Sequence, residues 1–307
     1  MSPVALRITS RYLPRKRTLH FTWASGAAAY CHFTQIHGLA WPEERIVPEE
    51  AIVSVHHRSH VAVLTIDNPP VNALSSHTLA ALDSALSVVE ASPETKAIII
   101  TGAGEKAFAA GADIRELDAA RDVDGGRELI QRGQSLFARI AGFKLPVIAA
   151  INGVAFGGGL ELALACHLRL CSERALLGQT EINLGIMPGW GGTQRLSRLI
   201  GPSRALALIL TGDRVDAAEA YRIGLVDRIA PAEKLMEEAF SLAECIAARS
   251  APAVQSALRA LVDGLEMPLD AALRHEAELF VALMGSRDAA EGFRAFFEKR
   301  PPYFTDA

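Results

Sequence analysis

Residues 146–165 read PVIAAINGVAFGGGLELALA, and this stretch predicts a strand, a glycine-rich turn and a helix in immediate succession. The apolar run 146–151 is the expected strand, and the glycines at 153 and 157–159 mark the turn. A helix that begins near residue 159 presents backbone N–H groups that have no internal partner and carry partial positive charge. We therefore expect this segment to receive an anion, or an oxygen that becomes anionic during a reaction.

Strands and helices alternate on both sides of this segment. Further strands are expected over residues 61–66, 97–101 and 168–171. Helices are expected after a cap at Ser75 or Ser76 and over residues 127–140, because apolar residues recur there at helical spacing. Such alternation predicts a layered α/β fold. From about residue 200 the pattern is helical to the end of the chain.

Three parts of the chain differ in character. Residues 1–50 carry five Lys and Arg residues before Glu43, the first acidic residue. We expect this leader to be an N-terminal extension that is disordered or not part of the fold. The alternatives are a transit peptide, since such peptides are rich in Arg and poor in acidic residues, and a secretory signal, which the segment matches poorly. Residues 51–250 are expected to form the α/β core, and residues 251–307 a helical C-terminal region.

Composition excludes several classes of function. The 307 residues carry a formal net charge of -4, so no global basic field draws the protein to nucleic acid or to an anionic membrane. The sequence contains no run of 18 uncharged apolar residues, so we predict no transmembrane helix. The protein is therefore expected in the cytoplasm, or in an organelle if the leader is a transit peptide.

No metal or nucleotide motif stands out. None of the four cysteines forms a CxxC pair, and neither glycine cluster fits a dinucleotide or P-loop pattern. His56, His57 and His60 lie close together, and we expect them on an exposed edge or turn rather than around a metal ion. No metal site is predicted.

A second turn, FAAGADI at residues 108–114, also follows a strand and also exposes N–H groups. Two carboxylates lie in apolar surroundings, Glu161 in the first turn of a helix and Glu181 just before a loop. Taken singly, each turn is a tight connection, and Glu161 is an acid that stabilises the helix dipole. Taken together, the turns would hold one oxygen and the carboxylates one water, with one carboxylate accepting a proton while the other donates one.

These segments closely resemble the crotonase, or enoyl-CoA hydratase/isomerase, family, and the monofunctional enoyl-CoA hydratases most of all. The likeness covers roughly residues 52–305 in order, so it does not extend to the leader. The matching segments are NPPVNALS (68–75), AFAAGADIREL (107–117), PVIAAINGVAFGGGLELALA (146–165), GQTEINLGIMPGWGGTQRL (178–196) and DAAEGFRAFFEKRPPYF (288–304).

The resemblance implies a spiral of ββα units with a C-terminal helical region that builds homotrimers or hexamers. It implies a lyase of fatty-acid β-oxidation that adds water reversibly, in syn fashion, to a trans-2-enoyl-CoA and yields a 3-hydroxyacyl-CoA. No cofactor is implied, because CoA arrives as part of the acyl-CoA substrate. The alternative is a Δ3-Δ2-enoyl-CoA isomerase or another acyl-CoA enzyme on the same scaffold, although the presence of both glutamates favours hydration.

The resemblance also implies roles for single residues. Glu161 and Glu181 correspond to the catalytic glutamates that flank the water. Backbone N–H groups of Ala112 and Gly158 correspond to the oxyanion hole. The residues implied to bind the substrate are Ala112, Asp113, Ile114, Arg115, Gly158 and Gly189. Trp190 either walls the acyl pocket or packs as an ordinary loop residue.

Some relatives on this scaffold bind RNA through a Lys-rich helix. Here acidic residues interrupt the helices and the net charge is negative, so no nucleic-acid partner is expected. Membrane insertion is not expected either.

Overall fold

The computed structural model describes residues 44–45 and 52–307. The leader expected over residues 1–50 therefore lies outside the described residues, apart from the backbone of 44–45. The described residues belong to one compact unit, 39–307.

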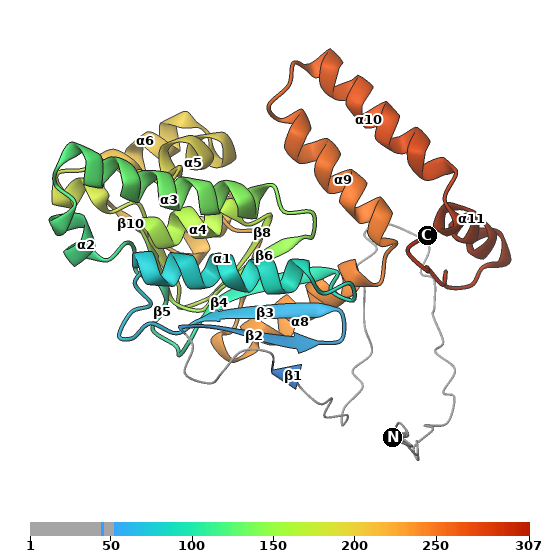
Figure 1. Ribbon diagram of the computed structural model, residues 1–307, viewed down its shortest axis with the longest axis horizontal. Coiled ribbons are helices and arrows are strands. Elements are labelled where there is room, and N and C mark those ends of the chain that lie inside the picture. The colour runs from blue at the N-terminus through green and yellow to red at the C-terminus, as the bar shows by residue number, and fades with distance from the viewer. Residues whose placement is uncertain (1–43, 46–51) are drawn as a thin grey trace, which may run out of the picture. The chain divides into compact units, whose positions relative to one another are not determined.

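The main sheet has seven strands in the order β1-β2-β3-β4-β6-β8-β11 (Figure 1). The first three strands pair antiparallel, and the pairs from β3 to β11 are parallel. The strands are β1 (Glu44–Arg45), β2 (Val53–Arg58), β3 (Val61–Ile66), β4 (Ala97–Gly102), β6 (Val147–Ile151), β8 (Leu168–Ser172) and β11 (Arg228–Ala230).

Helices cover this sheet on both faces. Strand β4 is buried along its whole length, with Ile98 and Ile100 in one apolar cluster and Ile99 in the other. The first cluster joins the sheet to α1 (Ser76–Glu90) and α3 (Val123–Ala141), and the second joins it to α8 (Leu235–Ala247). Alternate residues of a strand face opposite sides, so an unbroken apolar run is what a doubly covered strand requires.

A second, four-stranded sheet positions the functional turns. Its order is β10-β9-β7-β5, and β5, β7 and β9 are parallel. Parallel neighbours end at the same edge, so the turns that follow these three strands meet there. The strands are β5 (Ala107–Ala109), β7 (Val154–Phe156), β9 (Leu176–Gly178) and β10 (Arg214–Asp216).

The expected central elements are present, and the strand at 61–66 has the predicted bounds. The helix expected over 127–140 begins earlier, at Val123, because Asp122 caps it by accepting hydrogen bonds from the N–H groups of residues 124 and 125. The remaining helical segments are α2 (Ile114–Ala119), α4 (Gly158–Ala165), η1 (Glu181–Leu184), α5 (Gly192–Ile200), α6 (Pro202–Thr211), α7 (Ala217–Arg222), η2 (Ala232–Lys234), α9 (Ala251–Gly264), α10 (Leu269–Met284) and α11 (Arg287–Glu298).

Two expectations are wrong. The chain is not helical throughout after residue 200, because β10 and β11 each add a three-residue strand that is too short to show a period of two. His56 and His57 are not on an exposed edge or turn. Both lie half-buried in β2, between β1 and β3, and only His60 is exposed in a turn.

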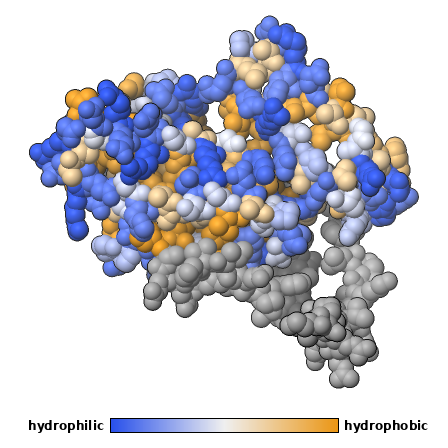
Figure 2. Space-filling view, viewed as in Figure 1, coloured by the Kyte–Doolittle hydropathy of each residue, from blue (hydrophilic) through white to orange (hydrophobic). Residues whose placement is uncertain are grey.

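The C-terminal helices differ from the core in what they bury. Helices α9 and α10 contain no buried residue, and apolar side chains lie on their surface (Figure 2). The domain boundary expected between residues 250 and 251 falls where α9 begins, and as a boundary it stays a prediction. Among the described helices, none combines the length and apolarity needed to cross a membrane. The exposed apolar residues of this region include Leu261, Leu265, Leu269, Leu273, Phe280, Val281, Phe293, Phe296 and Phe297.

The tail after α11 is tied back to the fold. Asp288 accepts hydrogen bonds from the N–H groups of Thr305 at 2.7 Å and Asp306 at 3.0 Å. The carboxylate of Asp306 in turn pairs with Lys96, which precedes β4, at 2.6 Å. These contacts fix the end of the chain against both its own last helix and the main sheet.

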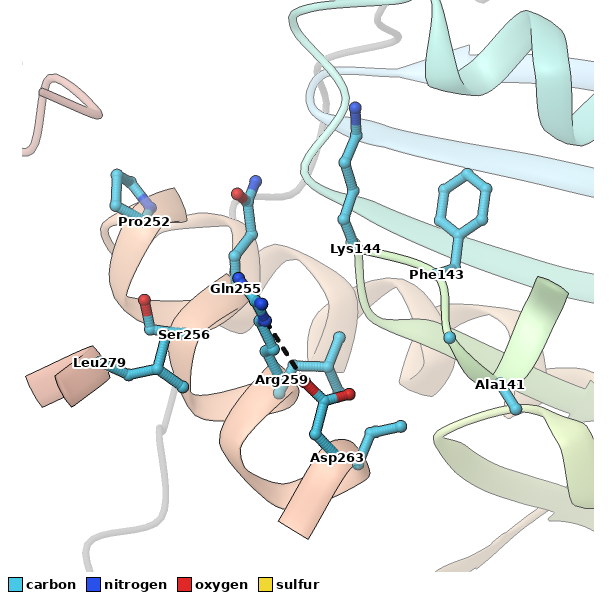
Figure 3. Close-up of a pocket in the computed structure, with 12 residues that line it drawn as sticks. Ala141, Phe143, Lys144, Pro252, Gln255, Ser256, Arg259, Asp263 and Leu279 are labelled. Carbon is cyan, nitrogen blue, oxygen red and sulfur yellow. Dashed lines mark hydrogen bonds and ion pairs between the residues drawn. The ribbon is translucent and has the colours of Figure 1, made fainter. Parts of the chain in front are cut away.

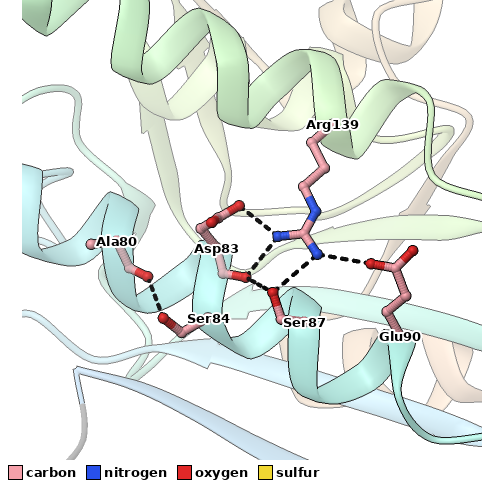
Figure 4. A network of polar contacts seen from close by, with 6 residues as sticks. All are labelled: Ala80, Asp83, Ser84, Ser87, Glu90 and Arg139. Atoms are coloured by element: carbon pink, nitrogen blue, oxygen red, sulfur yellow. Dashed lines mark hydrogen bonds and ion pairs between the residues drawn. The ribbon is translucent and has the colours of Figure 1, made fainter.

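A network around Arg139 joins the two helices that cover one face of the main sheet (Figure 4). The guanidinium of Arg139 on α3 donates to the Asp83 carboxylate at 2.6 Å and to Glu90 at 2.9 Å, both on α1. It also donates to the hydroxyl of Ser87 at 3.1 Å. Several charge-assisted bonds on one half-buried cation contribute more than an isolated surface pair.

We predict that Arg139→Ala lowers the free energy of unfolding by about 1–2 kcal/mol, because it breaks all of these bonds at once. The matched control is Arg132→Ala on the same helix, which removes one exposed pair with Glu128 and should change the free energy by less than about 0.5 kcal/mol. Urea denaturation measures both. Equal effects of the two substitutions would contradict a special role for the network.

Candidate active site

Glu161 lies in the first turn of α4, directly behind the glycine-rich turn. Every residue of this helix is buried, and Glu161 itself is only 2% exposed. The helix sits close to β5, because a β-carbon on Gly159 would collide with the carbonyl oxygen of Ala109. The carboxylate is thus placed inside the protein by a helix that only glycine allows to approach so near.

Two backbone N–H groups hold the Glu161 carboxylate. The N–H groups of Trp190 and Gly192 both donate to its Oε1 atom at 2.7 Å. Gly192 is the first residue of α5, so the carboxylate also receives the partial positive charge of that helix terminus. The anion that the start of this helix binds is therefore a side chain of the protein.

Burial first, and then the negative charge of Glu181, raise the pKa of Glu161, which lies at about 7. The two N–H donors and the charge of Arg195 oppose this rise. The effect of desolvation is larger than that of the donors and Arg195, as expected for a carboxylate with little contact to water, so the net change in the pKa is upward. Glu161 can therefore exchange a proton near neutral pH.

Glu181 opens η1 after β9, and β9 pairs with β7, the strand that precedes the helix of Glu161. Gly157 lies against it, because a β-carbon at 157 would come within 3.1 Å of a Glu181 carboxylate oxygen. The N–H of Gly157 donates to the carbonyl of Gly178 at 2.9 Å and joins the two strand ends. Burial raises the pKa of Glu181 as well.

Gln179 is the neutral partner of Glu181. With its amide nitrogen turned toward the carboxylate, Gln179 donates to both Glu181 oxygens, at 3.0 and 3.1 Å. Its side chain is 1% exposed. A buried amide that donates to both oxygens fixes the orientation of the carboxylate without neutralising its charge.

The backbone nitrogens of the two predicted oxyanion donors, Ala112 and Gly158, lie close together. A β-carbon on Gly158 would lie 3.4 Å from the Ala112 nitrogen, and one on Gly111 would lie 4.0 Å from the Gly158 nitrogen. Within residues 52–307, neither N–H finds a hydrogen-bond acceptor. Two unpartnered donors that converge at the end of parallel strands are suited to one oxygen atom.

The turn that carries Ala112 is fixed from behind. The N–H of Leu74 donates to the Gly111 carbonyl at 2.8 Å, and the N–H of Asp113 donates to the Leu74 carbonyl at 3.4 Å. Glu116, on α2, accepts from the N–H and hydroxyl of Ser76 at 2.8 and 2.7 Å. The Ala112 N–H takes part in none of these bonds and is left without an acceptor within residues 52–307.

The other predicted substrate contacts lie close to this turn. Asp113 caps α2 by accepting a hydrogen bond from the Arg115 N–H at 2.8 Å. Ile114 and Arg115 form the exposed first turn of the same helix. Gly189 directly precedes Trp190, one of Glu161's backbone donors, and its carbonyl accepts from Gln134 at 2.8 Å.

Trp190 is a buried part of the site rather than an exposed loop residue. It is 3% exposed, and its indole N–H donates to the Leu129 carbonyl at 3.2 Å. Its ring meets Phe137 edge to face, with 5.6 Å between centroids. The six-membered part of the ring lies against Gly158, where a β-carbon would approach it to 2.6 Å. Trp190 therefore closes the site between α3 and α4.

The structure brings together Ala112, Gly158, Glu161, Glu181 and the loop that contains Gly189, as the sequence predicts. Three contributors were not predicted, namely Gln179, Arg195 and the paired N–H groups of Trp190 and Gly192. The glycines of PGWGG before a helix were a signal for anion binding, but nothing local indicated that the anion is Glu161.

A separate hollow of about 430 Å³ lies between the end of α3 and α9 (Figure 3). Lys144 from the loop before β6 and Gln255 and Arg259 from α9 contribute to its wall. Arg259 is paired with Asp263 on the same helix at 3.3 Å. None of its lining residues belongs to the site described above, so this hollow is not the predicted active site.

The arrangement combines two chemical capacities in one place. Unpartnered N–H donors stabilise an oxygen on which negative charge develops, and they need no rearrangement to do so. A buried carboxyl group with a pKa of about 7, beside a second, half-buried carboxyl group, is suited to give and take a proton. Together these capacities suit proton transfer next to a carbonyl group.

Known proteins share both sequence and fold with this chain. The family model described as enoyl-CoA hydratase/isomerase matches residues 56–307. A probable enoyl-CoA hydratase of Bacillus subtilis is 46% identical over 245 residues, which are 80% of this chain and 95% of that relative. The short-chain-enoyl-CoA hydratase of Clostridium acetobutylicum is 43% identical over 241 residues, 78% of this chain and 92% of the relative.

A solved structure leads to the same conclusion. The crystal structure of an enoyl-CoA hydratase from Bacillus anthracis has a TM-score of 0.80 and 40% sequence identity. The match covers 83% of this chain and 100% of that one. The expected crotonase-like fold is thereby confirmed, and the chain belongs to the enoyl-CoA hydratase/isomerase family.

Proposed function

We propose that this protein is a hydro-lyase that adds water reversibly to a trans-2-enoyl-CoA and yields a 3-hydroxyacyl-CoA. The observation that carries the proposal is Glu161, a buried carboxylate coupled to Glu181 beside two unpartnered N–H donors. The hydratase names of the relatives support the same reaction. Fatty-acid degradation is the metabolic setting in which such a step occurs.

In the proposed reaction, the water oxygen bonds to C3 of the enoyl group. The electron pair of the double bond moves toward the thioester oxygen, where the N–H groups of Ala112 and Gly158 meet the developing charge. Removing one such donor typically costs a factor of about 10²–10³ in rate. The resulting enolate then takes a proton at C2, and water and proton enter on the same face.

The glutamate pair supplies and removes the protons in this scheme. One carboxylate accepts a proton from water while the other carboxyl group donates one to C2. Two neighbouring carboxylates in a site sheltered from water resist ionising together, so the pair is suited to hold one proton. The raised pKa values of Glu161 and Glu181, both due first to burial, support this sharing.

The start of α2 is the proposed contact for the CoA portion of the substrate. Asp113, Ile114 and Arg115 are adjacent to the Ala112 donor, and the last two are exposed. A guanidinium at this place is suited to a phosphate through charge-assisted hydrogen bonds. CoA enters as part of the substrate, so the scheme uses no further cofactor or metal. That the reaction needs neither stays a prediction.

Assembly into a homotrimer or a hexamer is also proposed. The apolar side chains on α9, α10 and α11 support it, because a helical hairpin with no buried residue is an incomplete packing unit. Phe280 and Phe297, at 62% and 78% exposed, are prominent examples.

The second candidate is a Δ3-Δ2-enoyl-CoA isomerase, which moves a proton between two carbons. One carboxyl group suffices for that transfer, whereas placing a water requires a second polar group next to the first. Gln179 fixes the orientation of Glu181, as a water-holding carboxylate needs. This observation favours hydration over isomerisation.

We predict that the protein removes the conjugated enoyl absorbance of crotonyl-CoA, and that Glu161→Gln and Glu181→Gln each lower kcat by about 10²–10⁴-fold. Glutamine keeps the size of each side chain but cannot exchange the proton. Glu173→Gln, an exposed change outside the site, is the matched control and should retain full activity.

Two outcomes would contradict the proposal. One is a folded wild type that binds CoA but leaves 2-enoyl-CoA unchanged while it converts 3-enoyl-CoA, which identifies an isomerase. The other is full activity in either glutamine variant, which removes the paired-carboxylate mechanism.

We further predict that the plot of kcat/KM against pH has a transition near pH 7, called its limb below, where Glu161 changes its ionisation. The negative charge of Glu181 is one cause of the raised pKa, so Glu181→Gln should move this limb to lower pH. The residual activity of the variant measures the shift. A limb that stays in place would show that the two carboxyl groups are not coupled.

A further inference from the structure

Arg195 lies behind the loop that holds Glu161. It belongs to α5, one turn beyond Gly191 and Gly192. Its Nη1 donates to the carbonyl of Trp190 at 2.9 Å, and its guanidinium lies against Gly191 so closely that a β-carbon there would collide with it. The same peptide segment thus receives Arg195 on one side and donates to Glu161 on the other.

A cation in this place is unfavourable on its own. Burial lowers the pKa of Arg195, and only the charge of Glu161 opposes that effect. The guanidinium also folds back toward the N-terminus of α5, where partial positive charge disfavours another cation. Packing alone does not explain an arginine at this position. The Glu161 carboxylate explains it, because a carboxylate that must ionise inside the protein is stabilised by a nearby positive charge.

The other charged side chain that acts on Glu161, that of Glu181, shifts its pKa in the direction opposite to Arg195. Helix α4 packs against α3, α5, β5 and β7, and η1 carries the second carboxylate. Strands β5 and β7 contain no titratable residue, and α3 meets the Gly189–Trp190 segment with the apolar residues Leu129, Ile130 and Phe137. Glu181 raises the pKa of Glu161, and Arg195 is the cation that lowers it.

We propose that Arg195 is a positioning residue that holds the Trp190–Gly192 segment against Glu161 and sets the ionisation of that carboxyl group for catalysis. It touches neither the water nor the thioester, and it acts through the Trp190 peptide and through its charge. The kinetic part of this proposal depends on the hydratase function proposed above, whereas the electrostatic part does not.

The test compares Arg195→Gln, Arg195→Lys and the control Arg198→Gln. Arg198 lies on the same helix, is exposed, and bonds to Gln194 within that helix. Loss of the positive charge raises the pKa of Glu161, so the limb of kcat/KM against pH should move upward by roughly one unit in Arg195→Gln. Lysine keeps the charge and should return the limb toward its wild-type position, while Arg198→Gln should not move it.

A purely structural role would lower activity by the same factor at every pH and leave the limb in place, which would overturn the proposal. A shift to lower pH, or an equal shift in Arg195→Lys, would overturn it as well. Circular dichroism checks folding, and Arg195→Met, which retains the apolar stem, replaces the glutamine variant if that one does not fold.

A measurement without substrate separates this proposal from the proposed function. Infrared titration of the Glu161 carboxyl group in Glu181→Gln should show a midpoint about one unit higher when Arg195→Gln is added. If the wild type turns over no 2-enoyl-CoA but the midpoint moves, the hydratase function fails and the role of Arg195 stands. If the midpoint does not move, the role of Arg195 fails whatever the enzyme does.

Discussion

The structure depends on one costly interaction, the burial of the Glu161 carboxylate among apolar residues. A charge in such surroundings is tolerated only where hydrogen bonds and opposite charge offset its lost hydration. Here the N–H groups of Trp190 and Gly192, the start of α5 and the charge of Arg195 provide this offset. The offset is incomplete, and the remaining penalty leaves the pKa near 7, where a proton can be exchanged.

The small parallel sheet explains how the other groups reach the same place. Strands β5, β7 and β9 end side by side, and the turns after them carry the Ala112 donor, the Gly158 donor and Glu181. Each donor is fixed by the backbone of its own turn and not by a ligand. Donors held in this way stabilise a developing oxyanion without first having to reorient, whereas water molecules would have to reorient at a cost in free energy.

Much of this could be predicted from the sequence because it is local. The strand, glycine-rich turn and helix around Gly158 follow from a contiguous run, and the positions of Glu161, Glu181 and Ala112 follow from motifs that resemble a known family. The contacts that tune Glu161 could not be predicted in this way. Its donors lie 29 and 31 residues away in sequence, and only the folded chain shows that they meet it.

The wrong expectations have equally physical causes. Three residues of β10 or β11 are too few to show a strand period, so helical neighbours hide them. His56 and His57 interrupt an apolar pattern, and they lie in the half of β2 that is only half-buried, whereas the first three residues of the strand are buried. For Trp190 the sequence left open a pocket wall or ordinary loop packing, and the structure adds a contact that neither predicted, the backbone donor to Glu161.

The most direct test is the free energy of unfolding of wild type and Glu161→Gln as a function of pH. Because the folded state binds the Glu161 proton more tightly than the unfolded state, wild-type stability should fall as pH rises from about 4.5 through 7. Glutamine removes this penalty, so the variant should be more stable than wild type by about 2–3 kcal/mol at pH 8. That difference should shrink toward zero near pH 5. Equal stability of the two proteins at every pH would contradict the view that the fold holds a strained, proton-exchanging carboxylate at its centre.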